Sequence, residues 1–197
     1  GDILEEKANT KASRDADGIK TTFSIEQRAT QYDTIQYLVI LVNAKQLKEQ
    51  YFDGILIGNI ADLHRYLISL GVVQFSLKEL LKGECTDIDF KKDFEATDED
   101  DYDKGNKLFW KRDNKGLQFN KRETTKIKTA PFFKIYSKTL DLLHKSNIFA
   151  LAHFKEIPQN LWRMEFTIKN KKHLASFGHG NTLSDIISLS NEQIEEM

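Results

Sequence analysis

The chain has 197 residues, 40% of them hydrophobic and 30% charged, and its 29 basic and 30 acidic side chains give a formal net charge of −1. This composition is typical of one folded domain with a sizeable core and excludes low-complexity disorder over most of the chain. The single cysteine, Cys85, excludes an intrachain disulfide and a multi-cysteine zinc site. No window is apolar enough to cross a membrane and no secretory leader opens the sequence, so we expect a cytoplasmic protein without a membrane partner.

Residues 1–31 are polar, carry mixed charges and show little periodicity. We expect them to form a flexible N-terminal arm, followed by one folded domain over residues 32–197. Charge is uneven along that domain: residues 84–103 contain ten acidic residues and two lysines, whereas residues 104–138 contain eleven Lys or Arg residues and two acidic ones. The near-neutral average therefore hides a basic segment suited to nucleic acid.

Four elements are predicted in the first part of this domain. Residues 32–42 are rich in β-branched and aromatic side chains and apolar throughout their second half, which indicates a central strand. Residues 54–57 favour a second strand. Apolar residues at helical spacing predict a helix over residues 59–68, and the capping-box pattern Ser-x-x-Glu predicts a short helix within residues 76–83.

The second part of the domain alternates strand and turn signals. Helices are predicted over residues 139–146 and from Leu183 onward, and the acidic run 95–103 is typical of a solvated loop. The predicted strands are 85–94, 107–110, 117–121, 132–137 and 161–169. Together the elements predict an α+β fold with a mainly antiparallel central sheet flanked by helices.

The segment Thr86–Asp93 carries three aspartates at spacings that a strand would place on one face. On a strand, Asp87, Asp89 and Asp93 point to one side and the apolar residues between them to the other. Hard oxygen ligands crowded in this way can bind a divalent cation, which offsets their mutual repulsion. A solvent-facing edge strand with ordinary acidic residues would give the same pattern.

Tyr136 lies near the end of the predicted strand 132–137, two residues from Lys134 and two from Lys138. If the strand continues, all three side chains project to one face, where the ammonium groups can bind phosphate oxygens and favour the phenolate. Tyrosine can then act as a covalent nucleophile. A strand tyrosine that only packs against its neighbours is the alternative interpretation.

The segment 161–169 alternates apolar and polar side chains with a period of two. Arg163 and Glu165 share one face and the apolar residues share the other, which predicts a half-buried strand. Glu165 is a candidate metal ligand or general base and Arg163 a candidate phosphate ligand, while a surface ion pair is the simpler alternative. Aromatic residues interleave with the basic ones over residues 104–138, a composition that predicts contact with a nucleic-acid backbone.

Four segments, taken in order, resemble the motifs of one protein family. They are Thr86–Asp93, Gly116–Thr124, Phe133–Lys138 and Trp162–Glu165. They are similar to the patterns Thr-Arg-Ile-Asp-Leu-x-x-Asp, Gly-Leu-x-Phe-Gly-x-Arg-x-Ser, Arg-Ile-Tyr-Asp-Lys and Trp-Arg-x-Glu. These patterns belong to the trans-acting replication initiators of rolling-circle plasmids from Gram-positive hosts and to the related gene II replication proteins of filamentous phages.

The chain departs from the family pattern at four positions. Asp87 and Lys134 each replace an arginine, Asn120 replaces a glycine, and Ser137 stands where an acidic or amide residue is common. The first two substitutions change the expected phosphate contacts. The tyrosine, lysine, aspartate and glutamate of the motifs are in place.

The resemblance implies that residues 32–197 are the catalytic domain of a DNA nicking and strand-transfer endonuclease for plasmid or phage replication. In that interpretation Tyr136 attacks one phosphodiester, which leaves a 5′ phosphotyrosyl link and a free 3′ hydroxyl that primes synthesis. Lys138 supports the phenolate, and a Mg²⁺ or Mn²⁺ ion polarises the phosphate. The implied ligands of the ion are Asp89 and Glu165, joined by Asp87 or Asp93.

The implied partner is single-stranded or hairpin origin DNA, and a host helicase and a second copy of the chain are further candidate partners. The candidate DNA-contacting residues are Lys121, Arg122, Lys134 and Arg163. Two alternatives stay open, namely a non-catalytic nucleic-acid-binding module and a protein-interaction domain that binds no nucleic acid. Metal-dependent cleavage separates the nickase from both.

Overall fold

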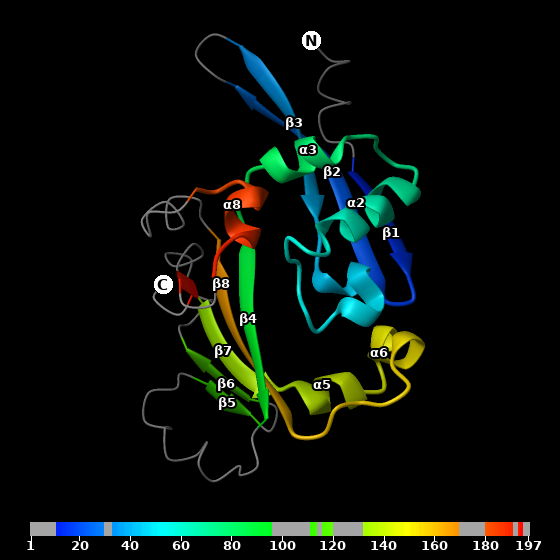
Figure 1. Cartoon of the computed structure of the whole chain (residues 1–197), viewed down its shortest axis with the longest axis vertical. Coiled ribbons are helices and arrows are strands. Elements are labelled where there is room, and N and C mark those ends of the chain that lie inside the picture. The colour runs from blue at the N-terminus through cyan, green and yellow to red at the C-terminus, as the bar shows by residue number, and fades with distance from the viewer. Residues whose placement is uncertain are drawn as a thin grey trace. The chain divides into compact units, whose positions relative to one another are not determined.

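A computed structural model of the chain describes residues 11–29, 33–95, 111–113, 116–119, 132–169, 180–190 and 193–194. The chain divides into two compact units, residues 1–75 and residues 76–197. Among the described residues, each unit contains an antiparallel sheet accompanied by helices (Figure 1), so the predicted α+β class is confirmed. The division does not fall at residue 31, where the sequence suggested a boundary between arm and domain.

The first unit is built on a three-stranded antiparallel sheet in the order β1-β2-β3. Its strands are β1 (Lys11–Ala16), β2 (Ile19–Ala29) and β3 (Thr34–Leu41). Asp17 and Gly18, with φ of 54° and 73°, link β1 to β2 in a tight turn that needs positive φ at both positions and so favours Asp-Gly. Residues 11–29 therefore form a hairpin, and the prediction of a flexible arm is wrong for them.

β3 occupies an edge of this sheet, with β2 beside it. The sequence predicted a central strand here because its second half is apolar, and the edge position corrects that prediction. Ile35, Leu38 and Leu41 stay exposed, at 51%, 41% and 61% of their full areas. Residues 54–57, the second predicted strand, form turns and bends instead of a strand.

The helical segments of the first unit are the 3-10 helix η1 (Ala44–Gln50) and helix α2 (Ile60–Ser69). Gln46 of η1 donates a buried hydrogen bond of 2.9 Å to Thr21 of β2 and so ties η1 to the sheet. Leu63 and Leu67 of α2 are fully buried, as the apolar spacing predicted. The helix predicted over residues 59–68 is therefore confirmed.

The second unit contains a five-stranded antiparallel sheet in the order β4-β8-β7-β6-β5. Its strands are β4 (Ile88–Glu95), β5 (Lys111–Asp113), β6 (Gly116–Phe119), β7 (Phe132–Ser137) and β8 (Leu161–Ile168). β8 lies between β4 and β7, and β6 pairs with the other side of β7, so strands from all four motif segments are consecutive neighbours in the sheet. The predicted strand 107–110 and the acidic run from residue 96 to 103 lie outside the described residues.

Short helices accompany the second sheet. They are α3 (Leu77–Lys82), α5 (Lys138–Leu143), α6 (Ile148–His153) and α8 (Leu183–Ile187). α3 begins at the predicted capping box, where Ser76 accepts a hydrogen bond from the backbone of Glu79 and the Glu79 side chain accepts one in return. α6 was not predicted. In the parts of the chain that the structure describes, no helix is long and apolar enough to cross a membrane.

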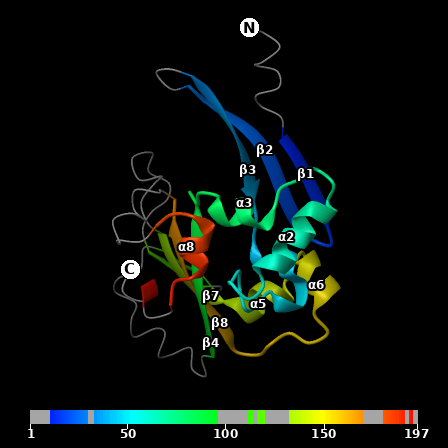
Figure 2. The same ribbon diagram turned by 45° about the horizontal axis from the view of Figure 1, so that its top comes forward.

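One face of the second sheet is apolar and packs against α8. Phe90 of β4, Ile168 of β8 and Ile186 of α8 form a buried cluster, and Phe166 packs against it. Figure 2 shows α8 beside this sheet from a second direction. Because this face is closed by hydrophobic packing, the polar chemistry of the sheet belongs to its other face.

Candidate active site

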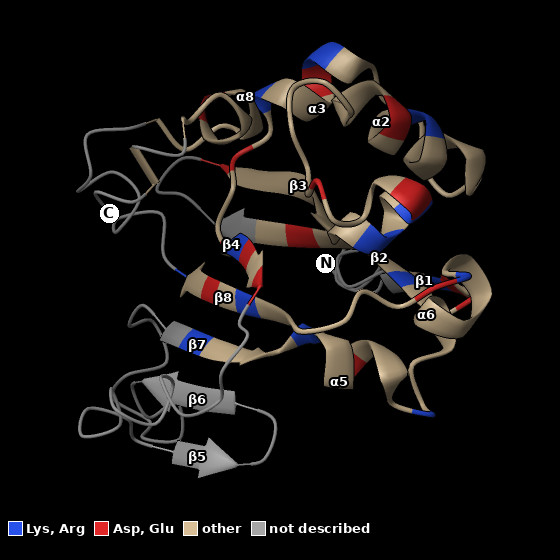
Figure 3. Ribbon diagram, turned by 60° about the horizontal axis from the view of Figure 1, so that its bottom comes forward, with Lys and Arg blue, Asp and Glu red and all other residues tan. Residues whose placement is uncertain are grey.

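The polar face of the second sheet runs across β4, β8 and β7. In an antiparallel sheet, residues directly opposite each other project to the same face. The opposed pairs on this face are Asp89–Thr167, Lys91–Glu165, Asp93–Arg163, Lys134–Glu165 and Tyr136–Arg163. We call these residues the polar face. Figure 3 shows acidic and basic positions next to one another on these strands.

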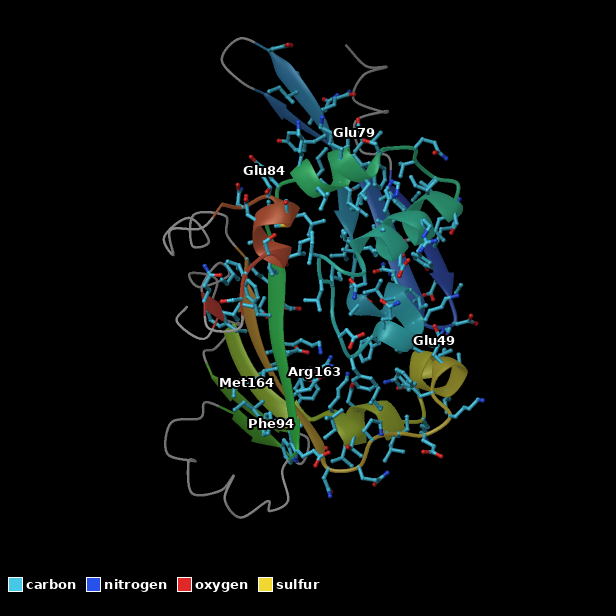
Figure 4. All side chains as sticks on the ribbon, viewed as in Figure 1. Glu49, Glu79, Glu84, Phe94, Arg163 and Met164 are labelled. Carbon is cyan, nitrogen blue, oxygen red and sulfur yellow. The ribbon has the colours of Figure 1, made fainter. Side chains whose placement is uncertain are left out.

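Arg163 and Met164, which are neighbours on β8, mark the two faces of the sheet. Figure 4 shows their side chains on opposite sides of it. Phe166 and Ile168 belong to the apolar cluster, whereas Glu165 lies on the polar face with Arg163. The period of two predicted for residues 161–169 is therefore confirmed.

Tyr136 and Glu165 meet at the centre of the polar face. The Tyr136 hydroxyl donates a hydrogen bond of 2.7 Å to Oε1 of Glu165. The second carboxylate oxygen, Oε2, forms an ion pair with Lys134. Glu165 is 9% exposed, and a carboxylate this buried requires such partners to offset its lost hydration. The carboxylate thus holds the phenol oxygen in a defined position on the sheet.

Two lysines approach the ring of Tyr136. Lys134 Nζ lies 5.3 Å and Lys138 Nζ 5.7 Å from the ring centroid, distances at which an ammonium is attracted to an aromatic face. Lys138 is buried at the start of α5, where its Nζ pairs with Asp141 at 2.5 Å. Lys134 instead shares the carboxylate of Glu165 with the phenol. Both predicted cations therefore lie beside the tyrosine, but Lys134 is the one bound to the same carboxylate.

Asp93 joins two cations on the polar face. Arg163 donates from Nε and Nη2 to its two oxygens at 2.6 and 2.7 Å, and Lys91 Nζ donates to Oδ2 at 2.9 Å. Burial alone would raise the pKa of Asp93, but the hydrogen bonds from Arg163 and Lys91 outweigh it and hold the pKa below its usual value of 3.8. The guanidinium is thus bound to a carboxylate, an arrangement that differs from the phosphate contact suggested by the sequence.

Asp89 and Asp87 have separate partners. Thr167 donates a hydrogen bond from Oγ1 to Asp89, and Lys169 Nζ lies 3.1 Å from Asp87 Oδ2. Among the described residues, no three His, Cys, Asp or Glu side chains lie close enough together to hold a metal ion. The structure therefore does not gather Asp87, Asp89 and Asp93 around one point.

Asp89 and Glu165 fit a metal site of two carboxylates. Asp89 opposes Thr167, two residues from Glu165, so the two carboxylates are diagonal neighbours on one face of adjacent strands. Diagonal neighbours lie about 7–8 Å apart, within reach of longer side chains. Mg²⁺ is commonly held by one or two carboxylates, with waters and substrate phosphates as its other ligands. Asp89 and Glu165 are the two carboxylates that such an ion would use, and it would have to replace Lys134 on Oε2 of Glu165.

Lys91 is a polar-face residue that the sequence did not single out. It lies directly opposite Glu165 on β4, as Lys134 does on β7. In the sequence Lys91 has an adjacent lysine, Lys92, and the period of two of a strand places Lys91 on the face of Asp89 and Asp93 and Lys92 on the other face. Lys121 and Arg122, the other predicted DNA-contacting residues, lie outside the described residues.

Comparison with known proteins gave no match: no protein-family model, no curated protein and no solved structure matches this chain. Function is therefore inferred from the chemistry of the polar face, together with the order of the sequence motifs.

Proposed function

We propose that this chain is a rolling-circle replication initiator that nicks single-stranded origin DNA with Tyr136 as its nucleophile. The observation that carries the proposal is the 2.7 Å hydrogen bond from the Tyr136 hydroxyl to Glu165. A phenol attacks poorly until it loses its proton, and a carboxylate within hydrogen-bond reach is placed to accept that proton. Tyr136 thus has the base that a nucleophilic tyrosine requires.

The proposed reaction exchanges one phosphate ester for another. The Tyr136 oxygen forms a bond to the phosphorus of the scissile phosphodiester while its proton passes to Glu165. The bond from phosphorus to the 3′ oxygen breaks, and that oxygen takes up a proton. The products are a 5′ phosphotyrosyl link and a 3′ hydroxyl that primes synthesis. Because the ester bond is conserved, the same link can later be attacked by a 3′ hydroxyl, which gives strand transfer.

Cations beside Tyr136 support this chemistry. Lys134 lies against both the ring and the Glu165 carboxylate, and Lys138 approaches the ring from the start of α5. Positive charge near the phenol oxygen stabilises the negative charge that develops there and attracts the DNA phosphate. Lys134 serves both purposes in the proposed mechanism.

A Mg²⁺ or Mn²⁺ ion would be held by Asp89 and Glu165. When bound, such an ion neutralises charge on the phosphate oxygens. Both oxygens of Asp93 bind cations, namely Arg163 and Lys91, and Asp87 pairs with Lys169, so these two aspartates are left out of the proposed ligand set. At Glu165 the ion would replace Lys134 on Oε2, while Oε1 keeps the hydrogen bond from Tyr136.

A second candidate is a non-catalytic nucleic-acid-binding module. One observation favours it: Glu165, Asp93 and Asp87 each form an ion pair with a lysine or an arginine, as acidic residues that only stabilise a sheet do. Such a module would bind DNA with or without Mn²⁺ and would never become attached to it.

The test is covalent attachment of DNA to the protein. A pool of single-stranded and hairpin oligonucleotides, labelled at the 3′ end, is incubated with the protein and Mn²⁺, and labelled protein is measured after denaturation. The wild-type chain is expected to become labelled and the Tyr136→Phe variant to lose the label. Tyr37→Phe, which changes an exposed tyrosine of β3, is the control and should keep it. Absence of wild-type label, or undiminished label in Tyr136→Phe, would overturn the proposal.

A further inference from the structure

Lys91 and Lys134 flank Glu165 from two different strands. Lys91 on β4 and Lys134 on β7 both oppose Glu165, which lies on β8 between them. Neighbouring strands are about 4.8 Å apart, so the backbones of β4 and β7 are separated by about 10 Å. Two ammonium groups are thus set across the sheet, with the carboxylate that holds Tyr136 between them.

These two lysines are more exposed than the arginine of the polar face. The side chains of Lys91 and Lys134 are 19% and 31% exposed, whereas that of Arg163 is 5% exposed. Arg163 is bound through two nitrogens to Asp93, and Lys91 donates to Oδ2 of the same carboxylate. On the polar face the charges of Lys91, Lys134 and Arg163 are matched in number by those of Asp89, Asp93 and Glu165. An anionic ligand would therefore be recognised by the two exposed ammonium groups themselves and not by an excess of positive charge.

We infer that Lys91 and Lys134 hold the DNA backbone on either side of the Tyr136–Glu165 pair, each through a different phosphate. The inference rests on the proposed function and adds a path for the substrate, which crosses β4, β8 and β7. Lysine meets phosphate as a point charge on a flexible stem, so each ammonium can turn from its carboxylate to a phosphate oxygen. Arg163 remains bound to Asp93 and does not contact the DNA, so in this inference it serves to position the Asp93 carboxylate that Lys91 also binds.

The spacing favours a chain of phosphates over a single small anion. The backbones of the two lysines lie about 10 Å apart, so each ammonium group can bind a different phosphate of one DNA strand. A single inorganic phosphate would contact both lysines only if the two side chains converged over β8, whereas successive phosphates of a strand let each lysine bind one. Binding of single-stranded DNA should therefore depend on both lysines at once.

The experiment compares Lys91→Gln with Lys92→Gln. Lys92 is the next residue on β4 and opposes Met164, on the other face of the sheet, so it is a matched control of equal charge. Binding of a fluorescent single-stranded oligonucleotide is measured by anisotropy in EDTA over a range of salt concentrations. Each phosphate contact adds about 0.7 to the slope of log K against log salt for single strands. Lys91→Gln is expected to lose about that much slope, and Lys92→Gln to keep the wild-type slope.

Two further variants keep the inference open to disproof. Lys134→Gln should lose the same increment as Lys91→Gln, and Lys91→Arg, which retains the charge, should keep the slope. A Lys91→Gln slope equal to that of Lys92→Gln would overturn the inference, as would an unchanged slope for Lys134→Gln. If Lys91→Gln does not fold, as judged by circular dichroism, the Lys134→Gln slope decides alone.

The proposed function fails by a different observation. Binding in EDTA requires neither cleavage nor metal, so the slopes test only the backbone contacts. Suppose that Lys91→Gln loses salt slope but the wild-type chain shows no covalent attachment in Mn²⁺. The proposed DNA path then stands, and the proposed nicking activity is wrong. If covalent attachment depends on Tyr136 but the salt slopes of the lysine variants equal that of wild type, the nickase proposal stands and the DNA path across Lys91 and Lys134 is wrong.

Discussion

The Tyr136 hydroxyl donates to the Glu165 carboxylate across two neighbouring strands, although the two residues lie 29 positions apart in the sequence. β7 and β8 bring them together because their register places Tyr136 opposite Arg163 and Lys134 opposite Glu165. The phenol, its acceptor and the nearest ammonium therefore sit on three positions of one sheet face.

Replacing Glu165 by Gln should slow covalent attachment by about 10²–10⁴-fold, the usual contribution of a general base. The amide keeps an oxygen that can accept the hydrogen bond from Tyr136, but it cannot take the proton. Single-turnover attachment of labelled DNA measures the rate, and anisotropy in EDTA checks that DNA binding persists. A rate within a factor of a few of wild type would remove Glu165 from the reaction.

Replacing Asp93 by Asn should destabilise the chain strongly, because the buried guanidinium of Arg163 then loses the carboxylate that its Nε and Nη2 bind. Breaking a buried ion pair on one side costs about 3–5 kcal/mol. Asp87→Asn is the matched control, since Asp87 pairs with Lys169 in an exposed position and an exposed pair contributes less than about 1 kcal/mol. Urea unfolding of both variants measures the difference. Equal free energies of unfolding would contradict the role given to Asp93.

The contribution of Asp93 to stability should depend on pH in one direction. Its pKa in the folded chain lies below the usual value of 3.8, because the hydrogen bonds from Arg163 and Lys91 outweigh the effect of burial. A lowered carboxyl pKa stabilises the folded state at pH values above the unfolded pKa, and this stabilisation is lost as pH falls through the folded pKa. The difference in unfolding free energy between wild type and Asp93→Asn should therefore shrink below about pH 4. A difference that stayed constant from pH 7 to pH 3 would speak against this assignment.

The Cys85 thiol should react slowly in the folded chain. Burial, reinforced by the negative charge of Asp185, raises its pKa to about 11, so little thiolate is present near neutral pH. Because Cys85 is the single cysteine, a disulfide reagent at pH 8 reports on it alone. The reaction is expected to be slow in buffer and fast in denaturant. Equal rates in the two conditions would show that the apolar cluster beside α8 does not enclose the thiol.

Local patterns predicted the elements that carry the polar face. The alternation in residues 161–169 assigned Arg163 and Glu165 to one side of β8, and the strand predicted over residues 132–137 has the same bounds as β7. Helix α2 and the capping box at Ser76 were also predicted correctly, because each depends only on side chains within one or two helical turns of one another. Local spacing fixes local geometry.

The pairing between strands could not be read from the sequence. Register decides that Lys91 and not Lys92 opposes Glu165, and that Asp93 meets Arg163. Register depends on which strands become neighbours, and β4 and β8 are separated by most of the second unit. The hairpin in residues 11–29 was missed because mixed charges mask its Asp-Gly turn, although that turn was a usable signal.

The central claim is that the Tyr136 oxygen becomes bonded to DNA, and the most direct measurement is the location of the attached nucleotide. After the reaction in Mn²⁺ and nuclease trimming, trypsin should release the peptide Ile135–Lys138, because it is bounded by Lys134 and Lys138. Mass spectrometry is expected to find this peptide carrying a nucleoside phosphate on Tyr136. A nucleotide on any other residue, or its absence from every peptide, would contradict the account.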